Sequence, residues 1–363
     1  MMGVLRLDEA GDVLLCGGVS ALLSSTLHLL GLFSTSCWLL FTTLWLLSAA
    51  TILLLSAVKV SSDGKVVVVT GCDTGFGNAL ALHLHNLGFR VVACCLREEG
   101  EGVQRLRDLK SPRLHLLQLD VTSQDQLKTT LSQVKNLIPE GEVLWGLVNN
   151  AGVSTFGEVE WVPEATYRKV LEVNLLGTVF ATKTFLPLIR RTRGRVVNIA
   201  SMYGRMGNTM RAPYVLSKYA VEGFTDCLRQ EMKVWGVKVC LVEPGNYVAA
   251  TNIFTDESVR QQAQVMWTAM TEEVQQDFPR SYFDSQVNLM MSYTNAGTRD
   301  VNDVVEAMTA ALTQKYPRAR YLPMDVTTRI RIFVATHLPE WVYDTCYITT
   351  ARPHLSLPNS AKP

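Results

Sequence analysis

Three residues of the chain could carry out proton transfer, namely Ser201, Tyr214 and Lys218. Tyr214 and Lys218 are four positions apart, a spacing that places two side chains on one face of a helix. A free tyrosine phenol has a pKa of about 10, and a nearby ammonium group favours its ionised form. We predict that Lys218 lowers the pKa of Tyr214, which acts as acid or base beside Ser201. Because this pair is common by chance, the prediction requires a redox cofactor site elsewhere.

A glycine-rich turn supplies that candidate cofactor site. Residues 65–69 predict a strand, and a helical pattern runs from the turn to Leu87. A strand, a glycine-rich turn and a helix together present backbone N–H groups to a pyrophosphate at the helix N-terminus. The predicted contacts from this turn come from Gly71, Asp73, Gly75, Phe76 and Gly77.

Further strands alternate with helical patterns along the rest of the chain, which predicts a doubly wound parallel α/β sheet. The expected strands are 89–96, 114–119, 144–148, 195–199, 237–242 and 318–322, and the expected helices are 104–109, 123–137, 164–176, 177–191 and 301–312. The candidate residues follow the strand ends, where ligands bind in such sheets.

The choice between NAD and NADP depends on the charges near the second strand. An acid at the end of this strand selects NAD, whereas a basic residue accommodates the 2′-phosphate of NADP. Here Cys95 occupies the strand end, so the usual acid is missing. Asp73 in the glycine turn favours NAD, and Arg97 is the argument for NADP. Asp120, at the end of the third strand, could hold the adenine.

The N-terminal region predicts a membrane anchor, because residues 13–58 contain no Asp, Glu, Lys or Arg. About 20 apolar residues cross a bilayer, so this region offers two passes, near 13–33 and 37–58, or one pass after an interfacial helix. We predict an anchor over 1–60, a catalytic domain over 61–348 and a flexible tail over 349–363. Lys59 and Lys65 weakly favour a cytosolic catalytic domain.

The overall composition limits the other classes of function. The chain is 48% hydrophobic with a net charge of +1, which excludes disorder and gives no basic excess for nucleic-acid binding. Its eight cysteines have no metal-ligand spacing, so we predict reduced thiols and no metal centre.

Taken in order, the motifs over residues 65–248 resemble the short-chain dehydrogenase/reductase family. The resemblance rests on the turn at 70–77, Asp120, Asn149-Asn150-Ala151-Gly152, Asn174, Ser201, Tyr214, Lys218 and Pro244-Gly245. It implies a Rossmann-type fold, hydride transfer to or from a nicotinamide cofactor, and commonly a homo-oligomer.

The resemblance also implies a role for each matching residue. Tyr214 would be the general acid/base, Ser201 would orient the substrate oxygen, Lys218 would hold the nicotinamide ribose, and Asn174 would support a proton-relaying water. The role of Thr251, which follows Pro244-Gly245 at a longer distance than usual, is left unassigned. The implied cofactor-binding residues are Gly71, Asp73, Gly75, Phe76, Gly77, Asp120, Asn150, Ala151, Gly152, Tyr214, Lys218, Pro244 and Gly245.

Within the family, residues 71–77 and 145–152 are similar to the branch of the 3-hydroxybutyrate, hydroxysteroid and retinol dehydrogenases. Residues 153–160, 204–206 and 243–251 are more similar to D-3-hydroxybutyrate dehydrogenase, which implies oxidation of (R)-3-hydroxybutyrate. Arg205 and Arg211 lie between the catalytic Ser and Tyr, where either could bind a carboxylate bidentately.

The alternative is a membrane-bound hydroxysteroid or retinol dehydrogenase. A membrane anchor suits a lipid-soluble substrate, and the aromatic and methionine residues of 246–298 could form an apolar lid. A silent scaffold is a third interpretation, which the intact Ser201, Tyr214, Lys218 and Asn174 disfavour. The expected location is the endoplasmic reticulum or the mitochondrial inner membrane.

Overall fold

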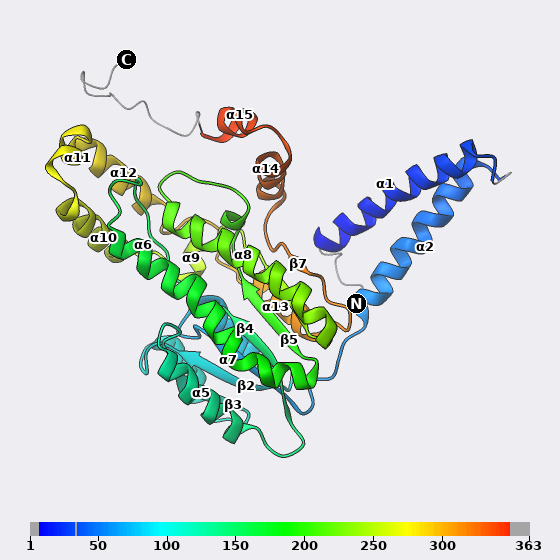
Figure 1. The fold of residues 1–363 in the computed structure, drawn as a ribbon, viewed down its shortest axis with the longest axis horizontal. Coiled ribbons are helices and arrows are strands. Elements are labelled where there is room, and N and C mark those ends of the chain that lie inside the picture. Colours follow the sequence, from blue (N-terminus) through cyan, green and yellow to red (C-terminus); the bar gives the residue numbers. More distant parts are fainter. Residues whose placement is uncertain (1–6, 33–34, 349–363) are drawn as a thin grey trace.

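The computed structural model describes residues 7–32 and 35–348, so the predicted tail over 349–363 lies outside the described residues. Its centre is a parallel seven-stranded sheet of order β3-β2-β1-β4-β5-β6-β7 (Figure 1). This arrangement confirms the predicted doubly wound, Rossmann-type fold. The strands are β1 (Lys65–Thr70), β2 (Arg90–Cys95), β3 (Leu114–Gln118), β4 (Val143–Asn149), β5 (Arg195–Ile199), β6 (Lys238–Val242) and β7 (Arg320–Tyr321).

Helices cover both faces of the sheet, and the β-branched run of β1 shows why. Successive side chains of a strand point to opposite faces, so Val67 and Val69 join one apolar cluster, whereas Val66 and Val68 join another. The first cluster includes α3 (Gly75–Asn86), α4 (Glu101–Asp108) and α13 (Asn302–Thr313). The second includes α5 (Gln124–Leu137), α7 (Gly177–Thr192) and α8 (Ala212–Met232). A strand buried on both faces explains why its sequence shows no polar alternation.

One predicted helix differs from the structure. The pattern over 164–176 predicts a single helix, but α6 (Glu164–Leu171) continues as a π-helical turn, Glu172–Leu176, that contains Asn174. A π-helical turn inside a helix is frequent at functional sites, because its wider hydrogen-bond ring changes the direction of nearby groups.

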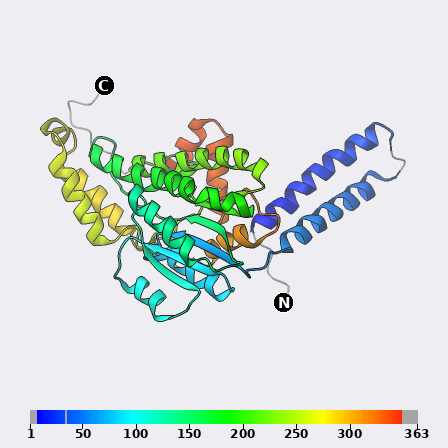
Figure 2. The same ribbon diagram turned by 60° about the horizontal axis from the view of Figure 1, so that its bottom comes forward.

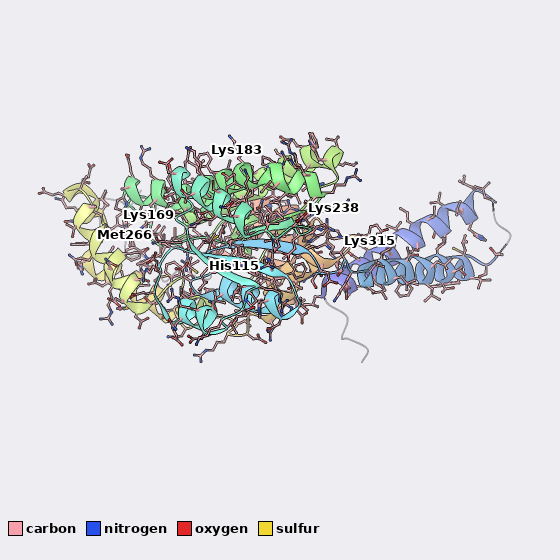
Figure 3. The ribbon with its side chains drawn as sticks, turned by 90° about the horizontal axis from the view of Figure 1, so that it is seen from below. His115, Lys169, Lys183, Lys238, Met266 and Lys315 are labelled. Carbon is pink, nitrogen blue, oxygen red and sulfur yellow. The ribbon has the colours of Figure 1, made fainter. Side chains whose placement is uncertain are left out.

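The segment after β6 forms a separate helical cluster at one end of the molecule (Figures 1 and 3). It contains α9 (Val248–Thr251), α10 (Asp256–Ala269), α11 (Glu272–Asp277) and α12 (Arg280–Ser292). Its apolar core, which includes Met266, Phe283 and Met290, also buries Trp161. Two further helices, α14 (Val326–His337) and α15 (Glu340–Tyr343), follow β7.

Two apolar helices form a hairpin that projects from the end opposite α10–α12 (Figures 1 and 2). By length and composition, α1 (Leu7–Leu29) and α2 (Cys37–Ala57) could each cross a membrane. Both ends of the hairpin are fixed to the sheet domain. Asp8 and Asp12 of α1 lie 2.7 Å from Arg329 and Arg318, respectively. Beyond α2, the N–H of Val60 donates to the carbonyl of Thr313 at 2.7 Å.

Candidate active site

A cavity of about 2230 Å³ lies at the carboxyl ends of the strands, between them and the α9–α12 segment. Small-molecule sites usually occupy roughly 300–1,000 Å³, so this cavity has room for a dinucleotide and a substrate together. Most of the candidate cofactor, catalytic and substrate residues line this cavity; the exceptions are Gly77, Arg205 and Asn174. Asn174 lies next to the lining, because its side chain is hydrogen-bonded to Val153, which lines the cavity.

The glycine turn has the shape that a bound pyrophosphate requires. Gly71 and Gly75 have φ of +69° and +58°, a region that favours glycine. A Cβ on Gly71 would lie 2.7 Å from the Cα of Ala151, and one on Gly77 would lie 2.4 Å from the carbonyl oxygen of Gly71. The first turn of α3 leaves its backbone N–H groups without intrahelical acceptors. The residues present therefore fit a dinucleotide.

Asp73 reaches the end of β2, although it belongs to a different turn. Its two carboxylate oxygens accept hydrogen bonds from the N–H groups of Leu96 and Arg97, at 3.0 and 2.9 Å. The sequence of β2 itself has no acid at its carboxyl end. The carboxylate of Asp73 lies at this position instead. Asp120 is held by its own turn, because it accepts from the N–H and hydroxyl of Thr122 at 2.9 and 2.7 Å.

Hydrogen bonds to backbone carbonyls hold two of the remaining candidate cofactor residues, Asn150 and Pro244, in place. The Asn150 side chain donates to the carbonyls of Thr70 and Gly71, at 2.9 and 3.0 Å, which joins β4 to the glycine turn. The Pro244 carbonyl accepts from the N–H of Met202 at 2.9 Å. These bonds join the end of β4 to that of β1, and the residues after β6 to those after β5; Ala151, Gly152 and Gly245 line the cavity at the same edge of the sheet.

Ser201, Tyr214 and Lys218 come together at this edge of the sheet. Ser201 follows β5, and its hydroxyl accepts from the N–H of Tyr203 at 3.2 Å and is close enough to Tyr214 to lower the pKa of the phenol. Lys218 lies one turn after Tyr214 on α8, and its Nζ donates to the carbonyl of Ile199 at 2.9 Å. The same Nζ lies 5.5 Å from the centroid of the Tyr214 ring.

The pKa values of this pair differ from the sequence-based expectation. Burial raises the pKa of Tyr214 to about 12, although the hydrogen bond from Ser201 and the charge of Arg211 lower it. Burial also lowers the pKa of Lys218 to about 8. The ammonium lies over the ring and is bound to a backbone carbonyl, and desolvation is the largest influence on the pKa of the phenol.

Asn174 is buried behind the catalytic residues. Its side chain exchanges hydrogen bonds with the backbone of Val153, at 2.8 and 2.9 Å, and donates to the hydroxyl of Ser217 at 2.9 Å. Ser217 in turn donates to the backbone carbonyl of Tyr214 at 2.7 Å. The amide therefore joins the π-helical turn to the part of α8 that carries Tyr214.

The two candidate substrate arginines have different surroundings. Arg205 does not line the cavity among the described residues, and its guanidinium lies 3.8 Å from both Glu222 and Glu243. The charge of Arg205 is therefore balanced by carboxylates of the protein itself. Arg211 lines the cavity at the start of α8, with its guanidinium 4.5 Å from the ring centroid of Phe254. Burial lowers the pKa of Arg211 below its usual value.

Several cavity residues were not predicted from the sequence. Tyr203 packs edge-on against Tyr214, with ring centroids 6.4 Å apart, and its hydroxyl accepts from Asn208 at 3.1 Å. Arg331 and Tyr347 reach the cavity from the C-terminal segment. The sequence offers one indication that Tyr203 belongs to the site, namely its position between Ser201 and Tyr214. No feature of the neighbouring sequence indicates that Arg331 reaches the cavity.

Comparisons with known proteins agree with this geometry. A family model described as short chain dehydrogenase matches residues 65–262. The mitochondrial D-beta-hydroxybutyrate dehydrogenase of Rattus norvegicus is 48% identical over 291 residues, which cover 79% of this chain and 85% of that protein. Retinol dehydrogenase 7 of the same organism is 43% identical over 258 residues, which cover 71% of this chain and 80% of that protein.

A solved structure has the same fold. A short chain dehydrogenase/reductase from Burkholderia phymatum in complex with NAD superposes with a TM-score of 0.61 at 22% identity. The match covers 76% of this chain and 95% of that one.

Proposed function

Because this chain belongs to the short-chain dehydrogenase family and is an oxidoreductase, we propose that it interconverts (R)-3-hydroxybutyrate and acetoacetate with NAD. The observation that carries the choice of substrate is Arg211. Among the described residues, its guanidinium has no carboxylate within ion-pair distance, although it lines the cavity three positions before Tyr214. The guanidinium is half-buried and contacts only neutral groups, the carbonyl of Thr155 at 3.5 Å and the ring of Phe254. A cation that lacks a carboxylate partner suits a substrate carboxylate, which can accept two parallel hydrogen bonds from it. The rat relative also carries hydroxybutyrate in its name.

In this proposal Tyr214 takes the hydroxyl proton during oxidation and returns it during reduction. Ser201, whose hydroxyl lies near Tyr214, holds the reacting oxygen beside the phenol. The buried Lys218 supplies positive charge next to Tyr214 and holds the nicotinamide ribose. Asn174 fixes the π-helical turn against α8 and supports the water through which protons reach Lys218.

NAD, when bound, accepts or supplies the hydride at the substrate carbon. The turn from Gly71 to Gly77 would hold its pyrophosphate, and Asp120 would hold the adenine. We propose NAD rather than NADP because the Asp73 carboxylate lies at the end of β2. There it would accept hydrogen bonds from ribose hydroxyls and repel a 2′-phosphate.

The test is the reduction of NAD and, in parallel, NADP by the full chain in detergent or vesicles. (R)-3-Hydroxybutyrate, estradiol and all-trans-retinol are the substrates. We expect turnover of hydroxybutyrate with NAD, and we expect Arg211→Met to lower kcat/KM about 10- to 100-fold, mainly through KM, because a hydrogen-bonded charge is lost. Arg205→Met is the matched control, with a smaller effect on KM. An unchanged KM in Arg211→Met would show that this residue does not bind the carboxylate.

The second candidate is oxidation of a lipid alcohol such as retinol. It is favoured by the apolar side chains that the α10–α12 segment contributes to the cavity, among them Met266, Leu289 and Met290. However, that segment lies at the end of the molecule opposite the hairpin (Figures 1 and 2), so the anchor does not bring it to the bilayer. Turnover of retinol or estradiol without turnover of hydroxybutyrate would establish this alternative.

We also propose that α1 and α2 cross an organelle membrane as a hairpin, in mitochondria or the endoplasmic reticulum. The 21 residues of α2 span about 31 Å, close to the thickness of the hydrocarbon core. Because Asp8 and Asp12 bind the sheet domain, the N-terminus and the catalytic domain must lie on the same side.

Protease protection of sealed vesicles tests this topology. We expect an N-terminal epitope tag and the catalytic domain to be digested from the same side, and a tag inserted after Thr35 to be digested only from the other. Opposite accessibility of the N-terminal tag and the catalytic domain would contradict the hairpin.

A further inference from the structure

We propose that Arg331 of α14 is a second cation of the substrate site and determines specificity for an anionic substrate. This inference rests on the proposed function, because it concerns the same cavity and the same carboxylate. It adds a residue from the C-terminal segment, more than a hundred positions from Tyr214 along the chain.

The surroundings of Arg331 differ from those of the other arginines nearby. Arg318 lies 2.7 Å from Asp12, and Arg329 lies 2.7 Å from Asp8. Arg320 lies within 3 Å of three carboxylates. Among the described residues, Arg331 has no carboxylate at ion-pair distance, and of these four arginines it is the one that lines the cavity. The chain thus neutralises the arginines that face its interior and leaves the cavity arginine without a counter-charge.

The guanidinium of Arg331 is held in place by neutral groups. Its Nε and Nη2 lie 3.2 and 3.0 Å from the hydroxyl of Tyr343, which itself donates to the carbonyl of Gly207 at 3.1 Å. Its carbon Cζ lies 5.3 Å from the ring centroid of Tyr347. These contacts fix the direction of the side chain and leave other N–H groups of its five donors free to bind an anion.

Arg331 and Arg211 line the same cavity. Burial raises the pKa of Tyr203, and the charges of Arg211 and Arg331 both oppose that rise; the Tyr203 ring packs against that of Tyr214. Asn208 links the two sides, because it donates to the Tyr203 hydroxyl at 3.1 Å and lies 3.5 Å from Nη2 of Arg331. Two guanidinium groups that line the same cavity attract a carboxylate strongly, whereas a neutral lipid alcohol would leave both charges without a counter-charge.

The test compares two ketones that share a four-carbon 3-ketoacyl group, one an anion and the other its neutral methyl ester. Acetoacetate and methyl acetoacetate are reduced with NADH by the detergent-solubilised full chain, and the ratio of their kcat/KM values is the readout. We expect Arg331→Gln, which can still bind Tyr343, to lower this ratio about 10- to 100-fold through loss of activity on acetoacetate. Arg331→Lys, which keeps the charge, should recover part of the ratio.

Arg329→Met is the control, because this neighbour on α14 binds Asp8 and does not line the described cavity. We expect it to leave the ratio unchanged. A ratio within twofold of the wild type in Arg331→Gln would overturn the role of Arg331 while the proposed function stands. A wild type that prefers the ester, or reduces neither ketone, would overturn the proposed function and this inference together.

Discussion

Replacement of Tyr214 by Phe lowers kcat for hydroxybutyrate oxidation about 10²- to 10⁴-fold, the usual contribution of a positioned acid or base. The change removes one hydroxyl near Ser201 and leaves the ring packed against Tyr203. The fold and the cofactor site should therefore be preserved. The measurement is NAD reduction at saturating substrate, with NADH binding followed by fluorescence to confirm an intact site.

The pH dependence gives a second readout of the same variant. Burial holds the pKa of Tyr214 near 12, so the phenol is mostly protonated at neutral pH. Proton uptake in the oxidative direction requires the ionised form. We expect wild-type oxidation to become faster as pH rises towards about 8, the pKa at which Lys218 loses its charge. The residual activity of Tyr214→Phe should lack this dependence.

Tyr219→Phe is the matched control, because Tyr219 lies on the same helix, is 45% exposed and does not line the described cavity. It should retain wild-type kcat. If Tyr214→Phe keeps more than about a tenth of the wild-type kcat, another group transfers the proton and the assignment fails.

Replacement of Arg320 by Met is expected to destabilise the protein by about 3–5 kcal/mol, the usual cost of removing one partner from a buried ion pair. Arg320 lies 2.9 Å from Glu222 and 2.6 Å from both Glu243 and Asp226. Glu243 is fully buried and Glu222 is 8% exposed, so both would lose the nearest cation without gaining water.

This loss of stability should grow as pH rises. Burial and the charge of Glu243 already raise the pKa of Glu222 to about 8, and burial raises the pKa of Glu243. Without Arg320 both folded pKa values move further above the unfolded value of about 4.3. A group whose pKa is raised on folding loses its stabilising contribution as pH rises through the folded pKa. Arg320→Met should therefore be less destabilised at pH 5.5 than at pH 8.

Urea unfolding of the detergent-solubilised chain at these two pH values measures the effect. Arg105→Met is the control, because its ion pair with Glu101 is exposed and its loss should change stability by less than about 0.5 kcal/mol. Equal losses for the two variants, or a loss at pH 8 no greater than that at pH 5.5, would refute a buried network that depends on Arg320.

The order of strands and helices was predictable because it depends on local pattern. Apolar runs such as β1 and the four-residue spacing of Tyr214 and Lys218 fix a strand and a shared helix face without information from elsewhere. Helix boundaries were less predictable, and the π-helical turn around Asn174 has no local signal. Its wider turn is stabilised by side-chain bonds to Val153 and Ser217, which are distant in sequence.

The sequence by itself determined the fold class, the cofactor turn and the grouping of Ser201, Tyr214 and Lys218, since each depends on residue type and short spacing. The tertiary structure decided which partner each charged side chain contacts. Arg205 and Arg320 meet the carboxylates of Glu222 and Glu243, whereas Arg211 and Arg331 face the cavity. Asp73 likewise reaches the end of β2 only through the folded turn. The free energy of a charge depends on the partners and water around it, and in this protein distant parts of the chain supply those partners.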